Sequence, residues 1–193
     1  MRTIETEIYK LSELSEDAQA TALDQFRELD YDWWEFVYDD AKTLGKILGV
    51  DIENIFFSGF SSQGDGACFE GKYEYSKGWK AKLLDYAPKD TELLDIGNML
   101  QEAQRTIFYQ GGASMQHRGH YMHPGCMAVT VDYGDSQSAE SGPEEGIMQA
   151  IRELANWIYA KLKNEYGYQT SDDVLRENIE ANEYEFEVNG TLA

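Results

Sequence analysis

Apolar residues recur every three or four positions in several stretches of the chain, as they do in helices that bury one face. The clearest stretch runs from Trp34 to Leu48, where Asp32 is a suitable N-cap and Gly49 a suitable residue just past the end. We expect further helices from Ser15 to about residue 29, at 77–86, at about 90–109, around 147–162 and from Ser171 onward.

Other stretches alternate apolar and polar residues, which is typical of half-buried strands. Residues 67–75 do so most clearly, and we expect strands also at 3–10, 52–58, 113–121, 126–133 and 184–188. This order predicts an α+β fold in a single domain covering residues 1–193. Its antiparallel or mixed sheet would have about six strands, built from two hairpins plus terminal strands, with helix pairs packed on one face.

The charge changes the picture most. The chain has 36 Asp and Glu against 16 Lys and Arg, a net charge of −20. Such a field repels phosphate backbones and anionic membranes, so we expect neither direct nucleic-acid binding nor membrane association. It favours basic partners, including proteins that themselves bind nucleic acid, and is compatible with a homo-oligomer. The alternative is that the charge serves solubility alone.

The two cysteines, Cys68 and Cys126, are too few for a disulfide scaffold. The first residues lack the apolar core of a secretory signal, and no apolar run reaches the roughly 20 residues that a membrane span needs. We therefore expect a cytoplasmic protein.

Residues 30–40 mix aromatic side chains with carboxylates. Trp34 and Val37 belong to the apolar stripe, so we expect Trp33 and Tyr38 to be partly exposed. Exposed aromatics among acids resemble an interface hot spot for Arg or Lys, although core filling is the alternative. The expected partner-binding residues are Asp30, Tyr31, Asp32, Trp33, Glu35, Tyr38 and Asp39.

The glycine-rich loop 59–66 separates two expected strands. Its three glycines permit unusual backbone angles and close approach of a ligand. It has no lysine and no following helix, as a phosphate loop would, so a wide hairpin turn is the alternative to a recognition loop. The candidate ligand-binding residues are Phe60, Ser61, Ser62, Gln63 and Asp65.

All three histidines, His117, His120 and His123, precede Cys126 at regular spacing, and these side chains are common zinc ligands. If the turn lies at 122–125, strand alternation places His117 and His120 on opposite faces, which disfavours a shared metal. The alternative is a polar hairpin tip. No catalytic motif for nucleophilic, phosphate-binding or metalloprotease chemistry is present, so we expect a non-enzyme without cofactors.

Several segments resemble a family of uncharacterised proteins encoded by tailed bacteriophages, some of which carry antitoxin-like labels. The resemblance rests on residues 8–15, Tyr31-Asp32-Trp33-Trp34, residues 57–67, residues 120–123, Tyr166 and residues 183–186. It implies an accessory protein acting inside an infected bacterium, and it implies no catalytic residues.

These observations together predict an acidic phage protein that binds a basic host protein of a defence or toxin system and neutralises or modulates it. Counter-defence, such as inhibition of a CRISPR or restriction system, and antitoxin-like activity both fit, with carboxylates mimicking nucleic-acid phosphates. The alternative is a small-ligand, nucleotide or metal-binding protein, or an enzyme, that uses loop 59–66 and the His117–His123 hairpin.

Overall fold

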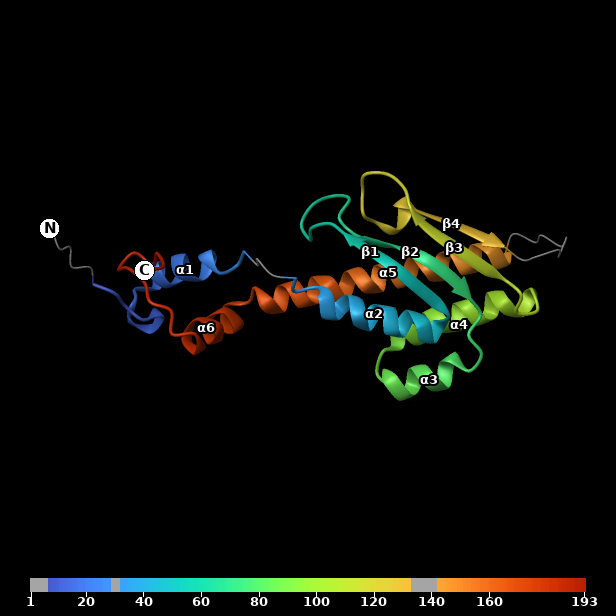
Figure 1. Cartoon of the computed structure of the whole chain (residues 1–193), viewed down its shortest axis with the longest axis horizontal. Helices are drawn as coiled ribbons and strands as arrows, with labels where there is room; N and C mark the ends of the chain where they lie inside the picture. The colour runs from blue at the N-terminus through green and yellow to red at the C-terminus, as the bar shows by residue number, and fades with distance from the viewer. Residues whose placement is uncertain (1–6, 29–31, 133–141) are drawn as a thin grey trace. The chain divides into compact units, whose positions relative to one another are not determined.

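The computed structural model describes residues 7–28, 32–132 and 142–193 (Figure 1). The chain forms two compact units, Met1–Trp34 with Asn164–Ala193, and Glu35–Lys163. The expectation of one domain over residues 1–193 stays a prediction.

The larger unit contains a four-stranded antiparallel sheet, drawn in Figure 1. Its strands are β1 (Val50–Phe57), β2 (Ala67–Glu74), β3 (Gly112–His117) and β4 (Met127–Asp132), and they pair in the order β1-β2-β3-β4. Both expected hairpins are confirmed, since β1 pairs with β2 and β3 with β4. The mixed alternative is wrong for this sheet, because every neighbouring pair runs antiparallel.

A bulge in β1 sets which side chains face the core. Ile52 pairs with Gly71, but Asn54 pairs with Glu70, so Glu53 is an extra residue in the ladder. The bulge shifts the alternation by one position. Ile52 and Ile55 are therefore both buried although they stand three residues apart.

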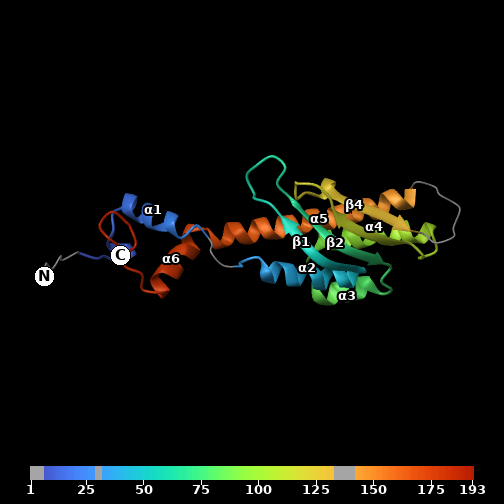
Figure 2. The same ribbon diagram turned by 45° about the horizontal axis from the view of Figure 1, so that its top comes forward.

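Helices cover one face of this sheet. They are α2 (Glu35–Leu48), α4 (Thr91–Thr106) and the first part of α5 (Gly142–Gln169), while α3 (Trp79–Tyr86) contacts α2 and α4. Figures 1 and 2 show α2, α4 and α5 on the same side of the strands, as expected. Phe69 and Tyr73 of β2 are buried on the side of the helices, whereas Lys72 and Glu74 are exposed on the other face. The core is apolar and joins strands to helices; its fully buried members include Phe69, Tyr73, Met115, Leu44, Leu93, Ile151, Leu154 and Ile158.

Two polar side chains fix the chain at the two ends of α4. Asp90 caps α4 by accepting a hydrogen bond from the backbone N–H of Leu93 at 3.1 Å. The buried amide of Gln104 holds Gly111 on both sides: its Nε2 donates to the Gly111 carbonyl at 2.6 Å, and its Oε1 accepts from the Gly111 N–H at 3.1 Å. Past the end of α2, Gly49 has a φ of +93°, which confirms its expected role as the residue after the helix.

The smaller unit is built from α1 (Glu16–Gln25), α6 (Asp172–Ala181), a 3-10 helix at Leu11–Glu13 and the last turns of α5. Ser15 caps α1 as expected, because its hydroxyl accepts from the Ala18 N–H at 3.4 Å. The apolar core of this unit joins both helices to the chain end; it consists of Leu11, Leu14, Ala18, Ala22, Leu23, Leu175, Ile179 and Phe186.

The expected terminal strands at 3–10 and 184–188 are not confirmed, and residues 3–6 lie outside the described residues. In the described residues they amount to single bridges, between Phe186 and Tyr9 and between Phe186 and Leu192. The chain turns on both sides of Phe186, with positive φ at Glu183 (56°) and Gly190 (88°), so the ladder cannot extend. Within residues 7–28, 32–132 and 142–193, the sheet has four strands, and the expected six are not confirmed.

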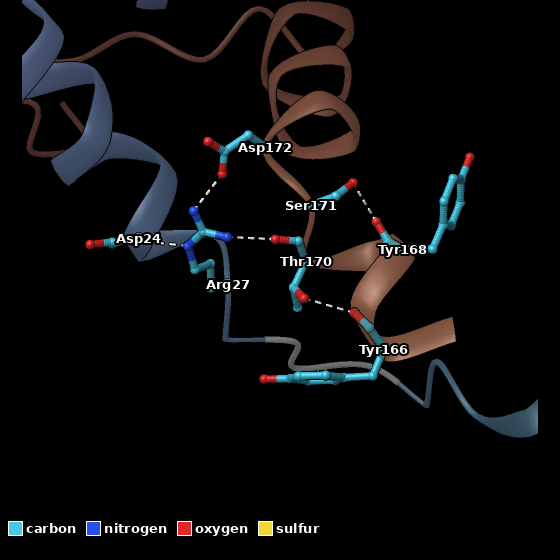
Figure 3. Close-up of polar contacts among 7 residues, drawn as sticks. All are labelled: Asp24, Arg27, Tyr166, Tyr168, Thr170, Ser171 and Asp172. Atoms are coloured by element: carbon cyan, nitrogen blue, oxygen red, sulfur yellow. Dashed lines mark hydrogen bonds and ion pairs between the residues drawn. The ribbon is translucent and has the colours of Figure 1, made fainter. Parts of the chain in front are cut away.

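Arg27 ties α1 to the segment that joins α5 and α6 (Figure 3). Its guanidinium donates to the Asp24 carboxylate at 2.9 Å, to the Thr170 carbonyl at 2.6 Å and to the Asp172 carboxylate at 2.5 Å. Both carboxylates favour the charged guanidinium and raise the pKa of Arg27. One side chain thus forms hydrogen bonds with α1, with α6 and with the turn that joins α5 to α6.

Candidate functional site

The expected partner-binding stretch spans the boundary between the two units, and its role stays a prediction. Asp30 and Tyr31 lie outside the described residues, and the boundary between the two units falls after Trp34. The expectation that Trp33 is partly exposed is wrong, because its side chain is only 7% exposed and its ring lies 5.6 Å from that of Tyr166. Trp34 is half-buried, so these two residues exchange the roles that the sequence predicts. Asp32 is exposed.

The rest of that stretch lies on α2. Glu35 and Asp39 are exposed as expected, and Tyr38 is half-buried with its ring 6.4 Å from that of Phe57. Burial, reinforced by the neighbouring Cys68 thiol, raises the pKa of Tyr38 to about 12. The aromatic side chain of this helix that faces solvent is Phe36, which is 53% exposed.

Loop 59–66 is ordered by its own side chains. The Asp65 carboxylate accepts from the backbone N–H groups of Ser61 at 2.9 Å and Ser62 at 2.6 Å. Phe60 is half-buried and stacks on Tyr159 with the ring centroids 5.5 Å apart, while Gln63 is exposed. Asp65 therefore stabilises the turn, and the ligand-binding role of this loop stays a prediction.

This loop lies against the hairpin that carries the histidines. A Cβ added at Gly66 would lie 2.7 Å from the Cβ of His123, and one added at Gly64 would lie 3.4 Å from the Tyr121 ring. Gly66 is required here because any larger residue would push the two loops apart. The structure thus brings together the two segments that the sequence offered as one alternative site.

The hairpin itself is more open than expected. Strand β3 ends at His117, and the Arg118 N–H donates to the Cys126 carbonyl at 2.9 Å, so Arg118 lies opposite Cys126. Residues 118–123 form a loop, and the prediction of a strand to residue 121 is wrong. The longer loop releases His120 from strand alternation, so face parity no longer governs the histidines.

The histidines are engaged by protein groups. Nε2 of His117 lies 3.2 Å from the carbonyl of Tyr121, which can only accept, so this nitrogen carries the proton. His120 packs edge-on against Tyr121, with ring centroids 5.5 Å apart. Among the residues that the structure describes, no three His, Cys, Asp or Glu side chains gather in a way that could hold a metal ion. The arrangement gives a zinc site at His117, His120 and His123 no support.

His123 forms a pair with Cys126. Nδ1 of His123 accepts from the Gly125 N–H at 3.1 Å, so the neutral ring carries its proton on Nε2, which lies 3.4 Å from the Cys126 sulfur. The imidazole therefore donates to the sulfur. The second thiol, Cys68, is buried, and burial, helped by Cys126 and Glu70, raises its pKa to about 12.

The carboxylates remain at the surface. None of the Asp and Glu residues described by the structure is buried. Ion pairs among the described residues join Arg27 to Asp24 and Asp172, Lys10 to Glu185 at 3.2 Å and Lys161 to Asp90 at 3.0 Å. With 36 acids and 16 Lys and Arg in the chain, internal pairing leaves a large excess of negative charge facing solvent.

A groove between α4 and α5 combines this charge with an apolar floor. It encloses about 440 Å³, and its lining comprises Glu92, Asp95, Ile96, Met99, Glu153, Asn156, Trp157 and Ala160. Sequence reasoning did not single out these residues. The available signal is that acids stand beside the apolar stripe of each helix, at positions 92 and 95 and at position 153.

Comparison with known proteins identifies a family without assigning a role. No curated protein and no solved structure matches the chain. Among the described residues, no helix has the length and apolar character needed to cross a membrane. The model of a family described as a domain of unknown function, DUF8835, matches residues 33–172. The chain therefore belongs to the DUF8835 family.

Proposed function

We propose that the protein is an acidic binding protein, encoded by a phage and active in the bacterial cytoplasm, that neutralises or modulates a basic host macromolecule. The observation that carries this proposal is the set of exposed carboxylates in excess of internal ion pairs. The partner is a protein that binds nucleic acid through Lys and Arg, such as a component of a defence or toxin system. The protein acts by binding and not by catalysis.

The mechanism is occlusion. Carboxylates on a folded surface occupy the lysines and arginines that otherwise contact phosphates, and the partner then loses its nucleic acid. Many such contacts are solvent-exposed, so their strength falls as ionic strength rises. Salt-dependent binding is therefore the signature of this mechanism.

Affinity capture followed by measurement with purified partners tests the proposal. The immobilised chain is incubated with bacterial extract at about 50 mM salt and washed at about 500 mM salt. We expect basic, nucleic-acid-binding proteins that are released by the salt wash and that lose nucleic acid when the purified chain is added. An unrelated folded protein of similar size and charge is the control. Capture of the same proteins by that control, or retention of nucleic acid, contradicts the proposal.

The contact between loop 59–66 and the hairpin favours a second candidate, a site for a small ligand such as a nucleotide. Gly66 and His123 hold the two loops in contact, which is a feature of preformed binding sites. A ligand screen by thermal shift, with His120→Ala/His123→Ala as the comparison, tests it. Shifts that are equal in both proteins count against this site, as does the absence of any shift.

A further inference from the structure

We propose that the groove between α4 and α5 is the docking site for a short basic amphipathic helix of the partner. This inference rests on the proposed function and deepens it, because it assigns the contact to one place on the larger unit. Four observations carry it: the shape of the groove, its floor, its charge and a cation already bound at its edge.

The shape suits a helix. The lining residues occupy positions 92, 95, 96 and 99 on α4 and positions 153, 156, 157 and 160 on α5, which is the same spacing on both helices. Each set spans about two helical turns, or roughly 10 Å. A pair of facing helices with this spacing presents a trough into which a third helix can place side chains at positions i and i+4. The volume of about 440 Å³ is that of a site for a few side chains.

The floor is apolar. Ile96 and Trp157 form its base, with Met99 and Ala160 beside them. Trp157 is only 3% exposed, so it is fixed in the core and presents a rigid surface. Met99 is flexible and half-buried, which suits contact with varied apolar side chains. An apolar residue of the partner would be removed from water here.

The walls are negative. Glu92, Asp95 and Glu153 line the groove, and none of its lining residues in the described part of the chain is Lys, Arg or His. Among the described residues, none of these three carboxylates forms an ion pair. The Glu153 carboxylate accepts hydrogen bonds from the side-chain amides of Gln149 and Asn156, which hold it in place without cancelling its charge. Lysines and arginines that flank an apolar residue complement this arrangement.

One edge of the groove already binds an ammonium group of the chain itself. Nζ of Lys161 lies 3.0 Å from Asp90 and 5.0 Å from the centroid of the Trp157 ring, and Trp157 donates its indole N–H to the same Asp90 at 3.0 Å. Burial works against the charged Asp90, but hydrogen bonds from the Leu93 N–H, Lys161 and Trp157 lower its pKa. A carboxylate and an indole face thus bind the chain's own lysine beside the groove, and the carboxylates of Glu92 and Asp95 are left for a partner lysine.

A labelled model peptide tests the groove directly. The probe is a fluorescent helical peptide of about 14 residues with leucines at i and i+4 and lysines on both flanks, measured by anisotropy against the full chain. A second peptide with glutamate in place of lysine is the negative probe. We expect binding of the basic peptide only, weakening as salt is raised.

Two groove variants and one matched control sharpen the result. Ala160→Phe fills the floor from an exposed position, and we expect at least a roughly tenfold loss of affinity. Glu92→Gln/Asp95→Asn keeps the shape but removes two charges, with an expected loss of about 5- to 30-fold. Asp173→Asn/Glu177→Gln makes the same charge change on exposed positions of α6 and should bind as the unmodified chain does.

The outcomes separate this inference from the proposed function. If the unmodified chain does not bind the peptide, or if all three variants bind it equally well, the groove is not the docking site. If a purified basic partner binds the chain and is unaffected by Ala160→Phe and by Glu92→Gln/Asp95→Asn, only the groove is wrong. If that partner displaces the peptide and both groove variants bind the partner more weakly, the groove is the site of contact.

Discussion

The Arg27→Ala substitution should open the smaller unit locally while leaving the larger unit intact. Arg27 makes three hydrogen bonds, two of them to carboxylates, and links α1 to the turn before α6. Its side chain is 39% exposed, so water and salt weaken both ion pairs to about 0.5 kcal/mol each. The bond to the Thr170 carbonyl adds about 1 kcal/mol. The expected loss is therefore about 2 kcal/mol of local opening free energy.

Native-state hydrogen exchange is the suitable assay because it reports each segment separately. A loss of about 2 kcal/mol corresponds to roughly 30-fold faster exchange in α1 and α6. Peptides from β1 and β2 should exchange as in the unmodified chain. Arg105→Ala, which removes an exposed arginine of α4, controls for the change in net charge.

The exposed ion pairs of Arg27 also make its contribution depend on salt. Since part of the effect comes from exposed ion pairs, the difference between Arg27→Ala and the unmodified chain should shrink as salt is raised. Arg27→Lys should keep some of the charge interaction but lose the forked geometry, and so fall between the two. Unchanged exchange in α1 and α6, or equal acceleration in β1 and β2, would refute the role assigned to this side chain.

Three further predictions concern the larger unit. Gln104→Ala leaves both polar groups of Gly111 without their buried partner, and we expect a loss of about 3 kcal/mol in urea unfolding, where Gln104→Glu should not rescue stability. Gly49→Ala places a Cβ 2.0 Å from a β2 carbonyl at a φ of +93°, so a loss of at least about 2 kcal/mol is expected in the same assay, and an unchanged midpoint would contradict the strained geometry. Burial raises the pKa of both Cys68 and Tyr73 to about 12, from 9.0 and 10.0. Because the folded state holds these protons more tightly, their contribution to stability is complete below about pH 9 and declines from there toward pH 12. Urea titrations at pH 8 and pH 11 check this decline, and Cys68→Ala should make stability depend less steeply on pH.

The helices can be predicted from the sequence because each of them buries a continuous stripe of apolar side chains. The residues at 34–48 and 93–107 repeat at helical spacing, and α2 and α4 lie over them. Both hairpins can also be predicted, because turn residues separate segments in which apolar and polar side chains alternate. Periodicity could not locate the start of α2, where both Trp33 and Trp34 satisfy an apolar pattern and the fold buries Trp33 more deeply.

The errors come from non-local effects. Alternation near Phe186 is real, but positive φ at Glu183 and Gly190 limits it to single bridges. The extra residue Glu53 shifts the register of β1, and no local pattern in the sequence predicts such a bulge. The candidate groove was missed because its walls come from α4 and α5, which are about 60 positions apart along the chain. Only the packed structure places Glu92 and Glu153 around one depression.

The bulge at Glu53 also bears on how the sheet ends. β1 is an outer strand, and a flat outer strand offers unpaired backbone groups to any other extended chain. Here an extra residue bends this edge strand, and the exposed carboxylates of Asp51 and Glu53 add negative charge to it. Edge-to-edge pairing of the β1 strands of two copies would bring these like charges together. The bulge that shifts the register of β1 thus belongs to the features by which proteins disfavour edge-to-edge pairing of sheets.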